Sequence, residues 1–296
     1  MAEARIIDGK KHAADLRAEV KLEAAEFFTR TGTKPRIVFL LVGENPASQV
    51  YVRNKGIASE EAGFSHETLR FTPDVSESEI LETIARLNED KLTHAILCQL
   101  PLPSHISEEK VIEAVAPHKD IDGFHPINVG RLSIGRGEYF APCTPAGIIE
   151  MMMRENIDPS GKHVVVVGRS NIVGKPIASL LIQKAKGANA VVTLAHTGAG
   201  SRLSEFTREA DILITAMGVP NAITGDMVRE GVVVIDVGMN SIPDSTKKSG
   251  NRLTGDVDFT SVKEKASAIT PVPGGVGPMT IAMVLRNTMT AAKRQS

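Results

Sequence analysis

The stretch Val164-Val165-Val166-Val167-Gly168-Arg169-Ser170-Asn171-Ile172-Val173-Gly174-Lys175-Pro176 decides the fold. Four consecutive valines are typical of a strand that is buried on both faces of a parallel sheet. Gly168 then allows a tight turn, and Gly174 suits a helix packed closely on that strand. A strand, a tight turn and a helix N-terminus direct backbone N–H groups at one point, which attracts a phosphate. The pattern resembles a dinucleotide-binding turn with Ser170 in place of the middle glycine, and an ordinary strand–helix turn stays open.

The residues after this turn bear on which dinucleotide it would bind. NAD sites usually carry an acidic residue about 20 positions later, which accepts a hydrogen bond from the ribose 2′-hydroxyl. No acidic residue occurs here between Asp158 and Glu205. The neighbourhood is instead basic, with Arg169, Lys175, His196 and Arg202. Because a 2′-phosphate needs cations and hydrogen-bond donors, the stretch favours NADP over NAD.

Composition excludes several other classes of protein. The 296 residues suffice for one large or two medium domains. A net charge of −1 without a long basic run argues against nucleic acid as a partner. No apolar run approaches the roughly 18 residues that span a membrane. The two cysteines, Cys98 and Cys143, lack metal-ligand spacing, so we expect no metal site and reduced, buried thiols in a cytoplasmic protein.

Strands and helices alternate along the chain, which predicts an α/β fold with parallel strands and right-handed crossovers. Strands are expected over residues 36–42, 66–71, 94–100, 163–167, 191–194, 211–215 and 232–236. The longer helices are expected over residues 10–31, 47–62, 76–88, 108–116, 145–154 and 278–293. Residues 117–142 are polar and rich in turn formers, and such an irregular stretch inside a compact domain is usually functional.

Four side chains near the ends of these elements are candidates for chemistry. Tyr51 and Lys55 share one face of a predicted helix, and Gln99 ends a strand where parallel sheets place their ligands. Asp122 lies in the irregular stretch. A lysine beside a glutamine, in a cleft shared with an apolar ligand, would have a lowered pKa and could act as a base or proton relay. Taken singly, each has an ordinary explanation, as a surface lysine, a half-buried aromatic or a turn former.

A Tyr-x-x-x-Lys pair also occurs in short-chain dehydrogenases, which offers another interpretation. In those enzymes the glycine-rich turn precedes the pair and lies near the N-terminus. Here Gly168 follows Lys55 by more than a hundred residues, and this order disfavours that interpretation.

Six segments, in this order, resemble the bifunctional methylenetetrahydrofolate dehydrogenase/methenyltetrahydrofolate cyclohydrolase family, known as FolD, and together they cover nearly the whole chain. The segments are Tyr51-Val52-Arg53-Asn54-Lys55, Gln99-Leu100-Pro101-Leu102-Pro103, Lys119-Asp120-Ile121-Asp122-Gly123-Phe124, Pro142-Cys143-Thr144-Pro145, residues 168–176, and Pro271-Val272-Pro273-Gly274-Gly275-Val276-Gly277-Pro278-Met279-Thr280. Each segment alone is common, whereas the set is highly specific.

The resemblance implies two α/β domains with a cleft between them. A catalytic folate-binding domain would comprise residues 1–145, completed by the C-terminal segment 273–296, and a Rossmann-like NADP-binding domain with a parallel sheet would comprise residues 146–272. It also implies a homodimer and two reactions on tetrahydrofolate derivatives. The first passes a hydride from 5,10-methylenetetrahydrofolate to NADP, and the second hydrolyses the 5,10-methenyltetrahydrofolate formed to 10-formyltetrahydrofolate.

The resemblance further implies roles for individual residues. Lys55 would be central to proton transfer in the hydrolytic step and would be tuned by Gln99. Tyr51 would stack on the aminobenzoyl ring of the folate, and Asp122 would accept hydrogen bonds from the pterin. The implied folate-binding set is Tyr51, Val52, Arg53, Asn54, Lys55, Cys98, Gln99, Leu100, Asp122, Pro273, Gly274, Gly275, Val276 and Gly277. The implied cofactor-binding set is Gly168, Arg169, Ser170, His196, Thr197 and Met239.

One segment departs from the family pattern. The family often has His-Ser, a basic residue and Thr after the second nucleotide-binding strand, whereas this chain reads His196-Thr197-Gly198-Ala199-Gly200. Arg169 therefore becomes the main candidate for binding a 2′-phosphate. Two alternative functions stay open, a dehydrogenase without cyclohydrolase activity and a folate- or nucleotide-binding protein without turnover. The complete set of Tyr51, Lys55, Gln99 and Asp122 argues against both.

Overall fold

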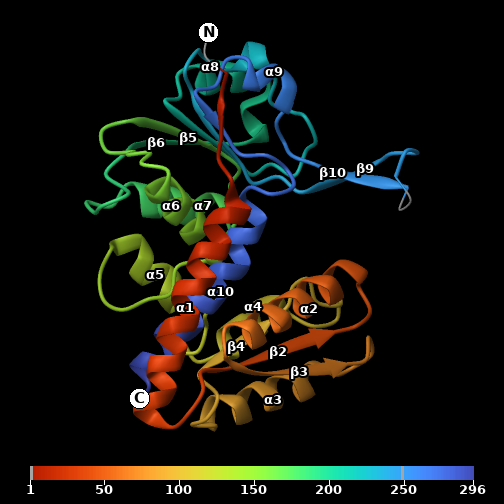
Figure 1. Ribbon diagram of the computed structural model, residues 1–296. Helices are drawn as coiled ribbons and strands as arrows, with labels where there is room; N and C mark the ends of the chain where they lie inside the picture. The colour runs from red at the N-terminus through yellow and green to blue at the C-terminus, as the bar shows by residue number, and fades with distance from the viewer. Residues whose placement is uncertain (1–2, 248–249) are drawn as a thin grey trace. The chain divides into compact units, whose positions relative to one another are not determined.

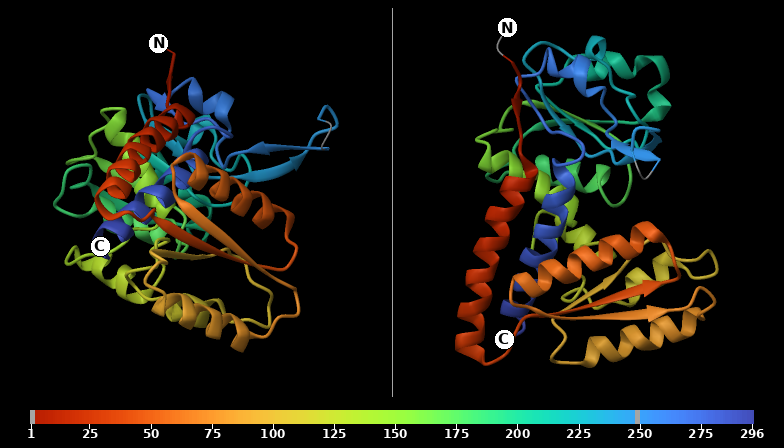
Figure 2. Two further views of the ribbon diagram at one scale, coloured as in Figure 1. Left: turned by 60° about the horizontal axis from the view of Figure 1, so that its bottom comes forward. Right: turned by 45° about the vertical axis from the view of Figure 1, so that its right-hand side comes forward.

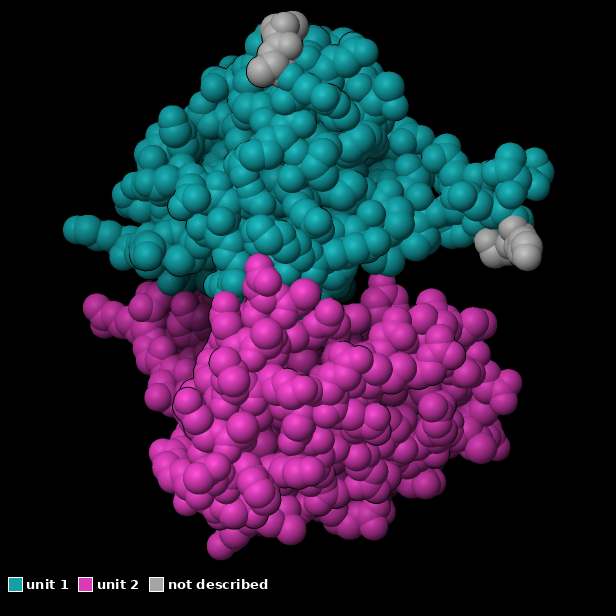
Figure 3. All heavy atoms as spheres, viewed as in Figure 1, with its two compact units in different colours: residues 1–13, 144–280 teal, residues 14–143, 281–296 magenta. Residues whose placement is uncertain are grey.

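The computed structural model describes residues 3–247 and 250–296 (Figure 1). The chain divides into two compact units, which Figure 3 colours separately. Unit 1 contains the described residues up to Ala13 together with Thr144–Thr280, and unit 2 contains Ala14–Cys143 and Ile281–Ser296. The division therefore falls inside two long helices, α1 (Gly9–Thr31) and α10 (Val276–Arg294).

Unit 1 is built on a six-stranded sheet in which every pairing is parallel. The strand order is β1-β11-β8-β7-β5-β6. The strands are β1 (Arg5–Ile6), β5 (His163–Val167), β6 (Val191–Ala195), β7 (Ile212–Thr215), β8 (Val233–Asp236) and β11 (Ala268–Ile269). The helices are α6 (Cys143–Arg154), α7 (Gly174–Leu181), α8 (Leu203–Arg208) and α9 (Phe259–Lys263), with short 3₁₀ turns at Thr197–Arg202 and Gly225–Met227. The four-valine strand is confirmed, since Val164 to Val167 are all 0% exposed at the centre of this sheet.

The strand order in unit 1 reverses at a defined place. The chain moves from β5 to β6 on one side and then returns to β7 on the other side of β5. At such a reversal the two crossovers leave in opposite directions, and ligands bind outside the carboxyl ends of the strands there. The turn after Val167 lies at this point, next to the end of β7.

A two-stranded antiparallel hairpin extends from unit 1. It is formed by β9 (Asn240–Pro243) and β10 (Asn251–Thr254), and it projects away from the six-stranded sheet (Figure 2). The hairpin was not predicted from the sequence, because each strand has four residues and little buried apolar surface.

Unit 2 contains a three-stranded parallel sheet in the order β3-β2-β4. Its strands are β2 (Arg36–Val42), β3 (Ser65–Phe71) and β4 (Ala95–Cys98), and its helices include α2 (Pro46–Glu61), α3 (Glu77–Glu89), α4 (Glu108–Ala114) and α5 (Pro126–Ile134). Apolar residues of β2 and β4 pack with those of α3 and α4 on one face of the sheet. Both carboxyl ends, at Val42 and Cys98, lie at the same edge, and α2 begins there.

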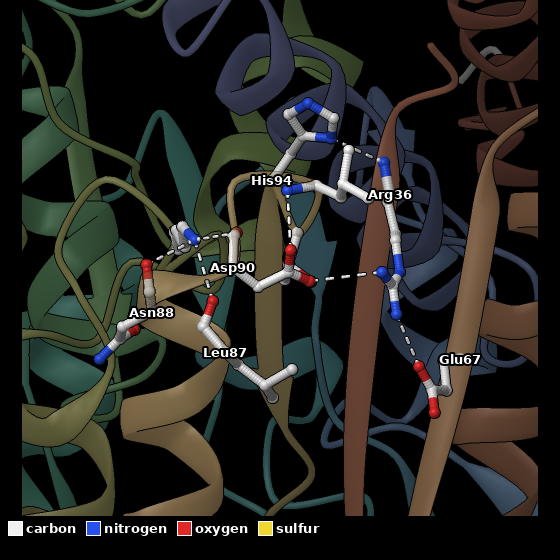
Figure 4. A network of polar contacts seen from close by, with 9 residues as sticks. Arg36, Glu67, Leu87, Asn88, Asp90 and His94 are labelled. Atoms are coloured by element: carbon white, nitrogen blue, oxygen red, sulfur yellow. Dashed lines mark hydrogen bonds and ion pairs between the residues drawn. The ribbon is translucent and has the colours of Figure 1, made fainter.

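A buried lysine closes the C-terminal end of α3. The Lys119 side chain is 2% exposed, and its Nζ donates to the carbonyl oxygens of Leu87, Asn88 and Asp90 at 2.9, 2.7 and 2.8 Å. These are carbonyls that a helix end leaves without intrahelical partners. Figure 4 shows this network continuing through the Asp90 carboxylate to Arg36, and from Arg36 to Glu67. Desolvation lowers the pKa of Lys119.

Two sequence expectations differ from the structure. Residues 117–142 were expected to be irregular, but α5 forms within them because His125 caps its N-terminus, Pro126 starts its first turn and Gly135 ends it at φ +64°. Two strands of two residues each, β1 and β11, were not predicted. Within residues 1–13, which the sequence analysis expects in the catalytic domain, Arg5–Ile6 forms β1 and pairs with β11 in the sheet of unit 1. The backbone hydrogen bonds of that pairing assign the N-terminal segment to unit 1.

Candidate active site

Lys55 and Gln99 are in direct contact at the carboxyl edge of the sheet in unit 2. Lys55 lies in α2, whose start is fixed by Asn45 accepting hydrogen bonds from the N–H groups of Ala47 and Ser48 at 3.0 and 3.1 Å. Its side chain is only 6% exposed, and Nζ donates to Gln99 Oε1 at 3.0 Å. Gln99 Nε2 donates to the Leu100 carbonyl at 2.7 Å, so the amide is oriented with its oxygen toward the lysine.

Asp122 belongs to the same group of side chains. Burial is the main cause that raises the pKa of its carboxyl, and the Lys55 ammonium lies close enough to oppose this rise. The Asp120 carboxylate raises the Asp122 pKa further, and a hydrogen bond with the Cys143 thiol lowers it. The structure therefore brings Lys55, Gln99 and Asp122 together, although more than forty residues separate Lys55 from Gln99 in the sequence.

The α2 residues expected to bind folate face in different directions. Tyr51 is half-buried, and burial raises the pKa of its hydroxyl. Val52 is 1% exposed and packs in the core, so its side chain offers no free surface to a ligand. Arg53 and Asn54 are exposed. Tyr51 and Lys55 lie four residues apart in α2, on one face of the helix as the sequence spacing indicated.

The two cysteines lie beside Asp122 and are free thiols. Cys98 ends β4 and is partly exposed as a residue, whereas Cys143 is buried. Burial raises the pKa of the Cys98 thiol to about 12, and the Asp122 charge adds to this rise. The Asn287 side chain contacts Cys143 as well. Its Nδ2 donates to the Ile121 carbonyl at 2.8 Å and lies 3.6 Å from the Cys143 sulfur. Sequence reasoning missed Asn287, because no motif marks it.

The segment Pro273–Gly277 lies in unit 1, where α10 begins. Within this segment, Pro273 is exposed, Gly277 is partly exposed, and Gly274, Gly275 and Val276 are buried. Leu100, which lies in unit 2, is partly exposed. A Cβ on Gly9 would lie 1.8 Å from the Gly275 carbonyl oxygen, so the segment packs on the backbone at the start of α1. A Cβ on Gly277 would come within 3.0 Å of the Met239 methyl carbon, which places these two candidates side by side.

The turn after β5 is tight, as its two glycines predicted from the sequence. Gly168 has φ +132°, and a Cβ there would lie 2.2 Å from the Ala216 carbonyl oxygen. A Cβ on Gly174 would lie 1.9 Å from the Gly168 carbonyl oxygen, so the turn folds tightly on the start of α7. Ser170 Oγ accepts hydrogen bonds from the N–H groups of Val173 and Gly174 at 3.1 and 3.4 Å. The serine that replaces the middle glycine therefore stabilises the helix start.

The basic side chains around this turn differ in what they already bind. Arg169 is exposed, and among the described residues its guanidinium makes no hydrogen bond or ion pair. Lys175 donates to Asn171 Oδ1 at 2.7 Å, and Arg202 pairs with Glu205 at 3.1 Å. His196 follows β6, and its Nδ1 accepts from the Gly198 N–H at 3.0 Å, while Thr197 is exposed. Of these four basic side chains, Arg169 is thus the one that makes no polar contact with another described residue.

Two buried carboxylates at the carboxyl edge of the same sheet were missed by the sequence reading. Asp236 ends β8 and is 3% exposed, and Asp256 follows β10 and is 0% exposed. Burial raises the pKa of Asp236 to about 6, with a smaller rise from the Asp256 charge. Among the described residues, no cluster of three or more His, Cys, Asp or Glu side chains is arranged to hold a metal ion. No helix in the described ranges is long and apolar enough to cross a membrane.

Comparison with known proteins agrees with this architecture. Residues 7–122 match the family model described as the tetrahydrofolate dehydrogenase/cyclohydrolase catalytic domain, and residues 142–296 match the model of its NAD(P)-binding domain. The chain belongs to the tetrahydrofolate dehydrogenase/cyclohydrolase family. The family expected from the six sequence segments is thereby confirmed.

The similarity to individual members extends over nearly the full chain. The bifunctional protein FolD of Prosthecochloris aestuarii is 52% identical over 98% of both chains. The crystal structure of the FolD enzyme of Campylobacter jejuni is 43% identical, with a TM-score of 0.93 over 99% of this chain and 100% of that one. The Trypanosoma brucei enzyme, crystallised with NADP cofactor and an inhibitor, is 37% identical, with a TM-score of 0.94 over 99% of both chains.

The family membership establishes the chemistry of the chain. It is an enzyme of one-carbon folate metabolism that oxidises 5,10-methylenetetrahydrofolate with NADP and hydrolyses the resulting 5,10-methenyltetrahydrofolate to 10-formyltetrahydrofolate. The α/β fold with a Rossmann-like parallel sheet in the NADP-binding part is likewise confirmed.

Proposed function

We propose that Lys55 is the proton-transfer residue of the hydrolytic reaction and that Gln99 positions its amine. The observation that carries this proposal is the contact of 3.0 Å between Lys55 Nζ and Gln99 Oε1 at the carboxyl edge of the sheet. Ligands of parallel sheets bind outside that edge. Lys55 is also nearly buried, and a positioned side chain in a site with little water is suited to acid–base catalysis.

The hydrolytic step requires protons to move between defined atoms. Water adds to the amidinium-like carbon of the methenyl bridge and loses one proton, which gives a neutral hydroxyl adduct. When the bond from this carbon to the ring nitrogen breaks, the adduct hydroxyl loses its proton to become the formyl oxygen, and the ring nitrogen gains a proton. A lysine side chain can serve both events from one position, because its neutral amine accepts a proton and the ammonium so formed donates one. The Gln99 oxygen accepts a hydrogen bond from the Lys55 amine, and the Leu100 carbonyl holds the amide in that orientation. Gln99 thus restricts the directions that the lysine amine can take.

The neighbouring residues would bind and orient the folate. We assign Asp122 to hydrogen bonds with the pterin, because its carboxyl lies within the electrostatic reach of Lys55. We assign Tyr51 to stacking on the aminobenzoyl ring, because it is half-buried on the same helix face as Lys55. Pro273–Gly277 and the other residues of the implied folate-binding set stay predictions. For Val52, such contact would have to come from its backbone, since the side chain is in the core.

The turn after β5 fits the diphosphate of NADP. Gly168 and Gly174 lie where a Cβ would overlap backbone, so the turn between strand and helix is as tight as in dinucleotide-binding turns, and it lies at the strand reversal. Gly168 and Ser170 would hold the diphosphate, Arg169 the 2′-phosphate, and His196, Thr197 and Met239 the neighbouring parts of the nucleotide. When bound, NADP supplies the hydride acceptor. The protein contributes orientation to that step, since hydride transfer needs no acid or base from the chain.

Replacing Arg169 with alanine should raise the Michaelis constant for NADP far more than that for NAD. A charge-assisted hydrogen bond contributes about 1.5–3 kcal/mol, which corresponds to a roughly 10- to 150-fold change. Steady-state kinetics with both cofactors measures the effect. Arg202→Ala is the matched control, because Arg202 is also exposed but already pairs with Glu205. An equal effect of Arg169→Ala on both cofactors would show that Arg169 does not bind the 2′-phosphate.

The assembly and location of the chain are also proposals. We propose a homodimer on the basis of the family resemblance, and a cytoplasmic location on the basis of the free thiols of Cys98 and Cys143.

A further inference from the structure

The two buried carboxylates in unit 1 hold the loop that follows β7. Asp256 Oδ2 accepts hydrogen bonds from the N–H groups of Met217 and Gly218 at 2.6 and 3.2 Å, and its Oδ1 accepts from the Val219 N–H at 3.0 Å. Three successive N–H groups of one segment thus converge on a single carboxylate, as in the backbone nests that bind anions. The Asn240 side chain adds a fourth donor at 2.9 Å.

Asp236 fixes the position of Asp256. Its Oδ1 accepts from the Asp256 N–H at 3.0 Å and from the Gly238 N–H at 2.9 Å. A Cβ on Gly255 would lie 1.8 Å from Asp236 Oδ2, and a Cβ on Gly238 would lie 2.4 Å from Asp256 Oδ1. The two carboxylates are therefore enclosed by backbone that approaches as closely as glycine allows. None of the ion pairs among the described residues involves Asp256, so N–H donors alone balance its charge.

The segment that Asp256 holds forms one side of the proposed NADP site. Residues 216–219 follow β7, and the Ala216 carbonyl oxygen lies 2.2 Å from the position of a Cβ on Gly168. This is the strand reversal at which a ligand is expected. Gly218 and Val219 are exposed, while their N–H groups point inward to the carboxylate. The buried charge therefore determines the shape of an exposed surface next to the phosphate-binding turn.

We propose that Asp256 is a positioning residue for NADP, which it serves by holding residues 217–219 in the binding conformation through their N–H groups. The inference rests on the NADP site proposed above. Asp236 supports Asp256 and does not touch this segment. Hydrolysis of methenyltetrahydrofolate consumes only water, and Lys55 and Gln99, the residues proposed for its proton transfer, lie in unit 2. Loss of the Asp256 charge should therefore weaken NADP binding and leave that reaction in place.

The test is the variant Asp256→Asn, with NADP affinity measured directly by calorimetric titration. An amide keeps the size of the side chain, but its NH₂ group must face N–H donors whichever way it turns. We expect the dissociation constant for NADP to rise roughly 10- to 100-fold, from the loss of charge-assisted hydrogen bonds. The Michaelis constant for NADP should rise in parallel, and the rate of hydrolysis without NADP should stay within about twofold.

Asp258→Asn is the matched control. Asp258 lies two residues further along, at the residue before α9, and its carboxylate accepts a hydrogen bond from the Ser261 hydroxyl at 2.7 Å and not from residues 217–219. It should leave NADP affinity unchanged. If Asp256→Asn does not fold, Gly218→Ala provides the same test. Gly218 has φ +69° with open space around it, so a side chain there changes the loop conformation without a collision.

The outcomes separate this inference from the site on which it rests. Normal NADP affinity in a folded Asp256→Asn protein, or in Gly218→Ala when the first variant does not fold, overturns the positioning role. If Arg169→Ala still weakens NADP binding in that case, the proposed site stands without it. If Asp256→Asn weakens NADP binding and hydrolysis equally, Asp256 has a general structural role and the inference is wrong.

Discussion

Replacing Lys55 with methionine should nearly abolish the hydrolysis of methenyltetrahydrofolate. Methionine keeps much of the length and apolar character of the lysine stem and removes the amine that donates to Gln99. Positioned acid–base groups contribute about 10²–10⁴-fold to a rate, and we expect a loss of that order. The dehydrogenase reaction removes only a hydride from a bound substrate. Part of it should survive, reduced to the extent that Lys55 also orients the folate.

Both activities should be measured on purified, folded protein, with folate binding determined separately. Lys119→Met is the matched control, because Lys119 is also buried but its amine binds three carbonyls at the end of α3. That variant should lose stability and keep its hydrolytic rate per folded molecule. Full hydrolytic activity in Lys55→Met would remove Lys55 from the mechanism. Equal loss of hydrolysis in both lysine variants would point to a structural effect instead.

Replacing Gly168 with alanine should abolish most NADP binding while hydrolysis continues. The added Cβ would lie 2.2 Å from the Ala216 carbonyl oxygen, at a φ of +132° that side chains rarely adopt. Such strain costs about 1–3 kcal/mol before the collision is counted, so we expect NADP affinity to fall roughly 100-fold or more. The turn can relieve the overlap only by moving away from β7, which opens the proposed diphosphate site.

Gly161→Ala distinguishes the collision from the backbone strain. Gly161 lies just before β5 at φ +68°, and a Cβ there meets nothing within 4 Å. It should cost stability without a comparable loss of NADP affinity. Titration with NADP and the hydrolysis assay without NADP report on the two functions in the same preparation. Wild-type NADP affinity in Gly168→Ala would place the cofactor somewhere other than this turn.

The long elements could be predicted from the sequence because their signals are local. Val164 to Val167 form one uninterrupted apolar run, and they lie at the centre of the sheet with no exposure. By contrast, Arg5–Ile6 is too short to show any periodicity. It becomes a strand only by pairing with Ala268–Ile269, at the other end of the chain. The sequence therefore did not predict this strand, since no local signal reports a partner so distant.

The candidate site shows the same division between local and distant information. Lys55 and Gln99 could be predicted to meet, because each lies near the carboxyl edge of the same parallel sheet. The arrangement around Asp256 could not, because its partners are the backbone N–H groups of Met217, Gly218 and Val219. Any residue other than proline supplies such a donor, so the side chains at 217–219 carry no trace of the interaction.

The discontinuity of both units bears on how the chain folds during its synthesis on the ribosome. Unit 2 needs Ile281–Ser296 to complete it, and residues 144–280 must be translated between its two parts. In unit 1, the first strand, Arg5–Ile6, has no partner until its pairing strand, Ala268–Ile269, has left the ribosome. At about 5–20 residues per second, each wait lasts on the order of ten seconds or longer. The nascent chain therefore carries incomplete units until late in translation, when chaperones that bind exposed apolar segments have most opportunity to act.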